Sequence, residues 1–397
     1  MPDLLPEDEL DAHLRAAISG LRVTPDQEPG QSRLDATTAL AIFDAQIGSR
    51  ALDIVARRLR AAGHGYYTIG SAGHEANAMV ATALRPTDPA LLHYRSGAFY
   101  LARAAQVQGA TPVQDVLLGL VAAAQEPIAG GRHKVIGNAD LAVIPQTSTI
   151  ASHLPRALGV AFAIERARKL DLDSAWPADA IAVASFGDAS ANHSTATGAI
   201  NAACQVAFRG LPMPLLLVCE DNGLGISVPT PDGWVAAAYA DRPGLCYIAA
   251  DGYDAAECWN AVCSAVEHVR TTRSPAFLHL KTVRYMGHAG SDGELGYRTR
   301  HELAADYDRD PIVGLARHLV ATGTAAAEDL VARYDIGLTY VASQAAEVAG
   351  APHLSSAAEI IAPLSPHTPG AVLREAARPP GVDARLAVFD GRLPEAG

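Results

Sequence analysis

Apolar residues recur at intervals of three and four between positions 33 and 63, in RLDATTALAIFDAQIGSRALDIVARRLRAAG. This is the period of an amphipathic helix, so we predict one long helix that ends at Gly63. A second helix is predicted after Gly73, in GHEANAMVATAL. The first 35 residues contain prolines and are only weakly periodic, so we predict an extended arm or a frayed terminus there.

Farther along the chain, short apolar runs alternate with helical patterns. We predict strands in DAIAVASF, PLLLVCE and PAFLHLKTV, and helices in STATGAINAACQVAFRG and AAECWNAVCSAVEHVR. This alternation is typical of β-α-β units, so the sequence predicts an α/β fold with a mostly parallel sheet flanked by helices. Ligands of such sheets bind at the carboxyl ends of the strands.

The same patterns divide the chain into four predicted segments. An N-terminal arm (1–35) precedes the α/β domain (36–320), which is followed by additional helices (321–362) and a tail or linker (363–397) rich in proline and glycine.

Composition excludes several classes of function. The 397 residues carry a formal net charge of −12 and no clustered basic surface, so we expect no nucleic-acid partner. No run approaches the length of a membrane span, and the acidic start MPDLLPEDELD lacks the pattern of a secretory signal, so we expect a cytoplasmic protein.

The five cysteines form no C-x-x-C pair, and we interpret them as buried, reduced thiols.

Asp188 and Asn222 each follow a predicted strand, with one predicted helix between them. If these strands are parallel neighbours, the two side chains meet at one edge of the sheet. Mg²⁺ prefers about six oxygen ligands, shared among carboxylates, carbonyls, water and phosphate. Asp188, Asn222 and a carbonyl from NGLG would supply three of them.

The residues around Asp188 are small. Gly187, Ala189 and Ser190 would let backbone amides and a helix N-terminus approach an anion closely. We predict that Ser190 or Asn192 caps the helix that follows.

The segment GDASANHSTATGAINAACQVAFRGLPMPLLLVCEDNGLGISVP resembles a known motif. It is similar to the thiamine-diphosphate motif, Gly-Asp-Gly followed by Asn-Asn, of the alpha subunits of 2-oxo acid dehydrogenase first components. HYRSGAFYLARA, TSTIASHLPRALGVAFA and RYMGHAGSDGELGYRTRHELAADYDRDPI resemble further segments of that family. In order, these segments cover about residues 40 to 320.

The resemblance implies roles for particular residues. Asp188, Asn222 and the carbonyl of Leu224 would bind Mg²⁺, and Tyr94 and Arg95 would hold the diphosphate. The other cofactor contacts implied by the resemblance are Ser148 and Ile150 near the aminopyrimidine, and Gly187, Ala189 and Ser190 along the motif.

His288 would lie beside the diphosphate and reach toward the substrate as the catalytic histidine. A pKa near neutrality would let it donate a proton or steady an anion as a cation. His153 and His193 lie close to the motifs, where a functional role and a capping or packing role remain equally open.

Two positions depart from the family motif. Ala189 replaces its last glycine, which would strain the turn if φ were positive, and Asp221 replaces its first asparagine.

The resemblance also implies an activity and partners. The chain would bind thiamine diphosphate and, with a beta subunit in an α₂β₂ assembly, oxidatively decarboxylate a branched-chain 2-oxo acid or pyruvate and acylate the lipoyl domain of an acyltransferase core. The beta part, which supplies an activating glutamate in that family, would be a separate chain or a C-terminal fusion. An acetoin dehydrogenase subunit, a split transketolase-like transferase and a non-catalytic diphosphate-binding scaffold stay open as alternatives.

Overall fold

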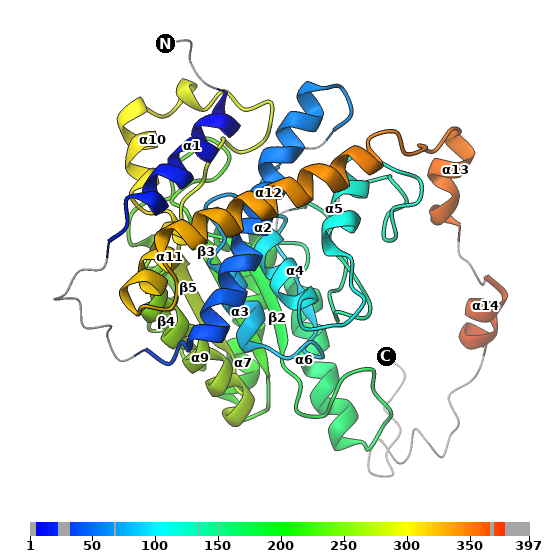
Figure 1. Cartoon of the computed structure of the whole chain (residues 1–397). Coiled ribbons are helices and arrows are strands. Elements are labelled where there is room, and N and C mark those ends of the chain that lie inside the picture. The colour runs from blue at the N-terminus through cyan, green and yellow to red at the C-terminus, as the bar shows by residue number, and fades with distance from the viewer. Residues whose placement is uncertain are drawn as a thin grey trace. The chain divides into compact units, whose positions relative to one another are not determined.

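A parallel sheet of five strands organises the chain, as the computed structural model shows (Figure 1). The spatial order of the strands is β1-β2-β3-β5-β4, and every neighbouring pair is parallel. The strands are β1 (Ala90–Leu91), β2 (Ala182–Gly187), β3 (Leu215–Asp221), β4 (Cys246–Asp251) and β5 (Ala276–Lys281). The sheet therefore has the predicted α/β, parallel character.

The structure describes residues 5–22, 32–66, 69–133, 135–149, 151–365 and 369–377. The chain forms two compact units, Met1–His353 and Leu354–Gly397. The second unit contains α13 (Ala357–Ile361), the 3-10 helix η3 (Ala362–Leu364) and α14 (Pro369–Ala377). Part of the predicted tail is thus helical, and its remainder lies outside the described residues. Across the described ranges, no helix has the length and apolar character needed to cross a membrane.

The two faces of the sheet pack into different hydrophobic clusters, because successive strand residues point to opposite faces. Val183, Leu216 and Leu278 belong to the larger cluster. Ala184, Leu217 and Phe277 belong to the smaller one. β2 and β3 are buried on both faces, which explains why both read as near-continuous apolar runs.

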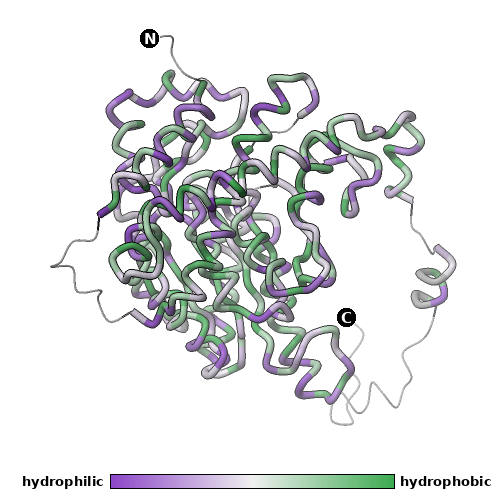
Figure 2. The backbone as a smooth tube through the Cα atoms, viewed as in Figure 1, coloured by the Kyte–Doolittle hydropathy of each residue, from purple (hydrophilic) through white to green (hydrophobic). Residues whose placement is uncertain are grey.

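Helices cover both faces of the sheet (Figure 1). The larger cluster receives residues from α2 (Ala36–Ala61), α3 (Asn77–Ala83), α4 (Gly97–Ala104), α5 (Pro112–Leu120), α9 (Ala255–Thr272), α11 (Pro311–Ala321) and α12 (Ala327–Val348). The smaller cluster receives residues from α6 (Leu154–Lys169), α7 (Ser194–Phe208) and α8 (Trp234–Tyr239). Hydrophobic and hydrophilic residues alternate around the helical turns in Figure 2, as expected for helices that bury one face.

The predicted long helix is α2, followed by Gly63 with a φ of +81°. The predicted helices α3, α7 and α9 are also present, as are three of the strands. The sequence reading missed β1, which has only two residues, and β4, an edge strand whose residues are mostly half-exposed.

The prediction of an extended N-terminal arm is wrong for residues 6–19. They form helix α1 (Pro6–Ser19), which buries Leu10, Leu14 and Ile18. Their spacing of four places these side chains on one helical face. The hydrophobic periodicity of residues 1–35 is weak as a whole, so the sequence did not predict this short apolar stripe, which tertiary packing stabilises.

A fully buried ion triad ties the helices to the segment that precedes α3. Arg50 on α2 donates to Glu75 at 2.6 Å and to both carboxylate oxygens of Asp310 at 2.8 and 3.2 Å. All three side chains are 0% exposed. Asp310 in turn caps α11 by accepting from the backbone N–H of Ile312.

Replacing Arg50 tests this triad. Arg50→Met leaves two uncompensated buried carboxylates, so we expect a loss of about 3–5 kcal/mol in the free energy of unfolding, measured by urea denaturation. The control Arg333→Met on α12 removes an exposed ion pair with Asp44, which lies on α2 as Arg50 does. It should lower the free energy of unfolding by less than about 1 kcal/mol. Equal losses in the two variants would contradict a structural role for the triad.

Candidate functional site

A cavity of about 140 Å³ opens at the carboxyl ends of β2 and β3. Every predicted site residue that the structure describes lines it: Tyr94, Arg95, Ser148, Gly187, Asp188, Ala189, Ser190, Asn222, Leu224 and His288. Ile150 lies outside the described residues. Segments far apart in the sequence therefore converge on one cavity, while their roles as ligands remain predictions.

Asp188 and Asn222 are brought together by the pairing of β2 with β3. Gly187 is in register with Glu220, so both strands end at the same level of the sheet. The Asp188 side chain is buried and accepts a hydrogen bond from the hydroxyl of Thr230. Burial raises the pKa of Asp188 to about 6, the Thr230 hydrogen bond lowers it, and the nearby Asp221 carboxylate raises it again. A bound cation would offset the free-energy cost of burying the ionised Asp188 carboxylate.

The turn after Asp188 accommodates alanine without strain. Ala189 begins the 3-10 helix η1 (Ala189–Asn192) and is not among the described residues with positive φ. The predicted helix cap is wrong: His193 caps α7 by accepting from the backbone N–H of Thr195 at 3.2 Å. Asn192 instead accepts from the Trp234 indole. His193 therefore has a capping role in the structure.

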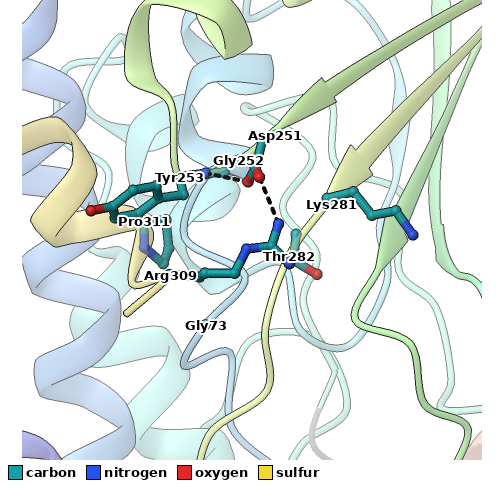
Figure 3. A pocket seen from close by; sticks show the side chains of 9 residues that line it. Gly73, Asp251, Gly252, Tyr253, Lys281, Thr282, Arg309 and Pro311 are labelled. Carbon is teal, nitrogen blue, oxygen red and sulfur yellow. Dashed lines mark hydrogen bonds and ion pairs between the residues drawn. The ribbon is translucent and has the colours of Figure 1, made fainter. Parts of the chain in front are cut away.

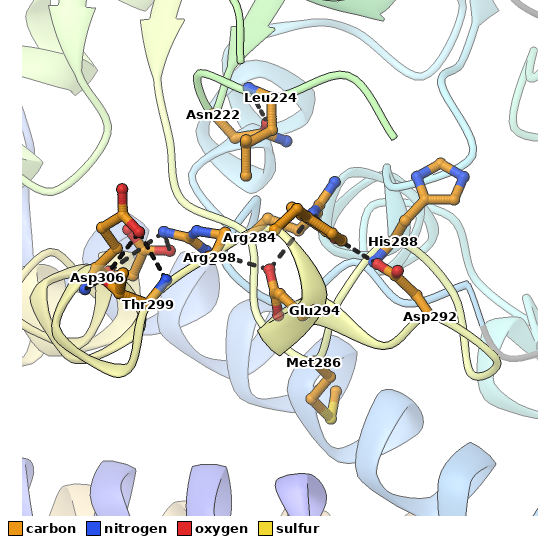
Figure 4. Close-up of polar contacts among 12 residues, drawn as sticks. Asn222, Leu224, Arg284, Met286, His288, Asp292, Glu294, Arg298, Thr299 and Asp306 are labelled. Carbon is orange, nitrogen blue, oxygen red and sulfur yellow. Dashed lines mark hydrogen bonds and ion pairs between the residues drawn. The ribbon is translucent and has the colours of Figure 1, made fainter. Parts of the chain in front are cut away.

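Asn222 begins a tight loop that folds back on itself. Its side-chain oxygen accepts from the backbone N–H of Leu224 at 3.0 Å, as the dashed line in Figure 4 shows. Backbone hydrogen bonds from Thr230 to Gly223 and from Gly225 to Val228, both 2.8 Å long, close the loop. The loop thereby presents Leu224 to the cavity and the Thr230 hydroxyl to the Asp188 carboxylate.

Asp221, which departs from the family motif, has its own partners on β5. It lies 2.7 Å from His279 Nε2 and pairs with the Lys281 ammonium. Burial opposes its ionisation, but hydrogen bonds from His279 and Lys281 outweigh burial and lower the pKa of Asp221 to about 2. The additional negative charge is therefore compensated next to Asn222.

Arg95 joins two segments around the cavity. It is 2% exposed and donates to the carbonyls of Gly70 at 2.6 Å and His288 at 2.9 Å. Its guanidinium lies over the Tyr94 ring, 5.2 Å from the centroid. A cation in this buried position suits an anionic ligand such as a diphosphate.

His288 has a lower pKa than the sequence analysis expected. Burial is the largest cause, and the cations of Arg95 and Arg284 add to it, so the pKa falls to about 4. The imidazole is thus neutral near pH 7 in this state. A bound anion beside it would raise the pKa again.

His153 is a buried packing residue. Its Nε2 lies 2.8 Å from the carbonyl oxygen of Ser185 on β2, and it precedes α6. The structure thus gives it a structural contact beneath the cavity.

Sequence reasoning assigned no role to three residues of the site: His93 and Arg284, which line the cavity, and Thr230, which donates to Asp188. His93 is buried, lines the cavity, and has an Nδ1 atom without a hydrogen-bond partner among the described residues. It stands directly before Tyr94, so the Tyr-Arg segment was the available signal. Nothing in the sequence pattern pointed to Thr230.

Arg284 links the two loops that flank the cavity (Figure 4). It donates to the carbonyls of Gly225 and Ile226 at 2.8 and 3.1 Å. On its other side it donates to the Tyr297 hydroxyl at 2.7 Å and to Glu294 at 3.3 Å. The Asn222 loop (residues 222–230) and the His288 loop (residues 286–298) therefore share one buried guanidinium.

A second hollow at the same edge of the sheet is closed by its own side chains (Figure 3). Asp251 at the end of β4 accepts from Arg309 at 2.6 Å and from the backbone N–H of Tyr253 at 3.0 Å. These contacts give Asp251 a structural role, so the cavity at β2 and β3 is the stronger candidate.

The residues present fit a hard cation with a diphosphate. Asp188 offers a carboxylate, and Asn222 and Leu224 offer neutral oxygens, the ligand types that Mg²⁺ prefers. Within the described ranges, no group of three or more His, Cys, Asp or Glu residues is arranged to hold a metal. The buried Asp188 carboxylate, whose ionisation burial opposes, is the member of this set that a bound cation would stabilise.

The raised pKa of Asp188 predicts that its ionisation at high pH lowers the free energy of unfolding of the ligand-free protein. The folded-state pKa of about 6 exceeds the ordinary 3.8, so the group's stabilising contribution is present below 3.8 and is lost as the pH rises through 6. Asp188→Asn should therefore raise the free energy of unfolding at pH 8, by at most about 3 kcal/mol, and by much less at pH 4. Urea denaturation without added metal or cofactor measures this. The exposed control Asp179→Asn should give no gain, and a wild type more stable than Asp188→Asn at pH 8 would contradict the account.

Arg284 should couple the order of its two loops. Arg284→Gln removes charge-assisted hydrogen bonds, so amide hydrogen exchange should rise about tenfold in both 224–226 and 287–298. In the control Arg298→Gln, the arginine that is lost contacts Glu294 and Asp306, so exchange should rise in 287–298 but stay unchanged in 224–226. Unchanged exchange in 224–226 of Arg284→Gln would show that the loops are independent.

Comparison with known proteins gives relatives of one kind. The chain is 27% identical over 265 residues to the 2-oxoisovalerate dehydrogenase subunit alpha of Bacillus subtilis (strain 168), covering 65% of this chain and 74% of that protein. It is 26% identical over 267 residues to the mitochondrial pyruvate dehydrogenase E1 component subunit alpha of Sminthopsis macroura, covering 65% of this chain and 66% of that protein. A probable subunit of the same name from Caenorhabditis elegans is 31% identical over 157 residues, 38% of each chain.

The family model described as "Dehydrogenase E1 component" matches residues 44–354, which include every residue that lines the cavity. This match and the named relatives confirm the resemblance found in the sequence. The chain belongs to the dehydrogenase E1 component family and is similar to the alpha subunits of 2-oxo acid dehydrogenases.

Proposed function

We propose that this chain binds thiamine diphosphate through Mg²⁺ and acts, with a beta subunit, in the oxidative decarboxylation of a 2-oxo acid. The observation that carries the proposal is the convergence of Asp188, Asn222, Arg95 and His288 on one cavity at the ends of two neighbouring parallel strands. Membership of the dehydrogenase E1 component family supports the same conclusion.

Each side chain has a task that its surroundings suit. Asp188, Asn222 and the Leu224 carbonyl would bind the cation, and Arg95 with Tyr94 would hold the diphosphate. Thiamine diphosphate, when bound, supplies the nucleophilic carbon and the electron sink for decarboxylation. The protein contributes placement and a buried electrostatic environment.

His288 would orient the substrate beside Arg95. Its neutral ring can donate a hydrogen bond, and its pKa of about 4 would rise when an anion binds beside the ring. An anionic ligand that binds beside His288 would therefore favour protonation of its ring, although Arg95 itself already contacts His288.

The chain supplies only part of the site. A cavity of about 140 Å³ is smaller than the 300 Å³ or more typical of sites that enclose a drug-sized ligand. The loop beside it and the start of α8 expose apolar side chains: Ile226 is 57% exposed, Val228 70% and Trp234 45%. Such a rim suits a protein partner. We infer that a beta chain covers it and completes the site, in an α₂β₂ assembly that passes the acyl group to a lipoyl domain.

Substrate choice stays within two classes. The relatives are named for 2-oxoisovalerate and for pyruvate, at nearly equal identity. A branched-chain 2-oxo acid or pyruvate is therefore the proposed substrate.

Reconstitution with the beta subunit tests the function. The α-β complex with Mg²⁺ and thiamine diphosphate should reduce a dye in the presence of 2-oxoisovalerate or pyruvate, whereas the lone chain should show little turnover. Asp188→Ala should lower cofactor affinity, measured by calorimetry, at least about tenfold, because the only proposed carboxylate ligand is lost.

Two outcomes would contradict the proposal. Cofactor affinity that is equal in wild type and Asp188→Ala would remove the metal assignment. Ketol transfer without 2-oxo acid-dependent dye reduction would place the protein among the transketolase-like transferases.

A further inference from the structure

A buried series of two hydrogen bonds runs from Glu220 through His74 to Asn222. His74 Nδ1 lies 2.8 Å from Glu220 Oε2, and His74 Nε2 lies 2.9 Å from Asn222 Nδ2. The side chains of His74 and Glu220 are both 0% exposed. Neither is among the residues that line the cavity, whereas Asn222 is.

The donor and the acceptor of each hydrogen bond follow from the groups at the two ends of the series, Glu220 and Asn222. Glu220 Oε2 accepts from the Asn77 amide nitrogen, so the proton of the neighbouring His74–Glu220 hydrogen bond is assigned to Nδ1 of His74. The Asn77 hydrogen bond is 3.2 Å long, and the other Glu220 oxygen, Oε1, has no hydrogen-bond partner among the described residues. Nε2 of a neutral ring is then an acceptor, and the amide nitrogen of Asn222 must face it.

The other end of the Asn222 amide is fixed independently. The backbone N–H of Leu224 donates to Asn222 Oδ1 at 3.0 Å, which requires an oxygen at that position. A carbonyl oxygen has two lone pairs, so Oδ1 can accept this bond and still bind a cation. If the amide were turned over, N–H groups would face both Leu224 and the cation, and neither contact could form.

The backbone holds His74 rigidly in place. Gly73 has a φ of +97°, and a Cβ atom there would lie 2.2 Å from the carbonyl oxygen of Val283, so the turn admits only glycine. Glu75, on the other side, accepts from the Gly73 N–H at 2.7 Å and belongs to the buried ion triad with Arg50. This fixed backbone, the full burial of the His74 side chain and its hydrogen bond to Glu220 together hold the imidazole against the Asn222 amide.

We propose that His74, held by Glu220, is a positioning residue that keeps the amide oxygen of Asn222 turned toward the divalent cation. The inference rests on the proposed function, because the cation belongs to it.

Mn²⁺ provides a probe whose free concentration can be measured by electron paramagnetic resonance. The test titrates Mn²⁺ into the α-β complex with thiamine diphosphate, for wild type, His74→Gln and His74→Leu. Glutamine offers one donor for Glu220 and one acceptor for Asn222, so its Mn²⁺ affinity should stay within about threefold of wild type. Leucine offers neither, so His74→Leu should bind Mn²⁺ at least about tenfold more weakly.

The outcomes separate this inference from the proposed function. Wild-type Mn²⁺ affinity in His74→Leu, together with Mn²⁺ binding that Asp188→Ala abolishes, would overturn the positioning role and leave the function standing. No Asp188-dependent Mn²⁺ binding in wild type would overturn both.

A second variant covers the case in which His74→Leu does not fold. His74→Lys keeps a donor for Glu220 but offers Asn222 only donors, so the amide oxygen should turn away from the cation and Mn²⁺ affinity should fall at least about tenfold. Wild-type affinity in folded His74→Lys would overturn the positioning role.

Discussion

The site depends on the parallel pairing of β2 with β3. Because the two strands run in the same direction and in register from Ala182 with Leu215 to Gly187 with Glu220, their last side chains meet at one edge. Antiparallel pairing, or a shift of register, would separate Asp188 from Asn222. The apolar residues on both faces of these strands fix that register, so the hydrophobic core sets the geometry of a polar site.

Burial then determines the charge of each group at this edge. Asp188 is buried with a hydroxyl partner and has a raised pKa, whereas Asp221 is buried with an imidazole and an ammonium and has a lowered one. His288 is kept neutral by burial and by the cations around it. Neighbouring carboxylates of similar sequence context thus acquire opposite properties, which suits one of them to a cation and the other to its own protein partners.

Much of the fold could be predicted from the sequence because its signal is local. The apolar runs of β2, β3 and β5 and the period of α2 stand out within a few residues. The helix at residues 6–19 was missed because its buried stripe is short and gains stability only from tertiary packing. Strand β4 was missed because an edge strand keeps polar and half-exposed positions.

The residues of the candidate site likewise fall into those that the sequence could predict and those that it could not. Asp188 and Asn222 could be paired from the alternation of strands and helices, and the resemblance supplied Arg95 and His288. The partners that set their chemistry could not be found, because Thr230, His74 and Arg284 come from other segments and carry no motif of their own. Only the fold brings them within hydrogen-bond distance.

The central claim is that Asp188 and Asn222 bind one cation together. Crystals of the α-β complex grown with Mn²⁺ and thiamine diphosphate, measured at the manganese absorption edge, test it most directly. The account predicts one anomalous peak per alpha chain that contacts an Asp188 carboxylate oxygen and the Asn222 amide oxygen, each at roughly the 2.0–2.6 Å of metal–oxygen bonds to hard cations. A peak bound elsewhere, or a cofactor bound with no metal beside Asp188, would contradict it.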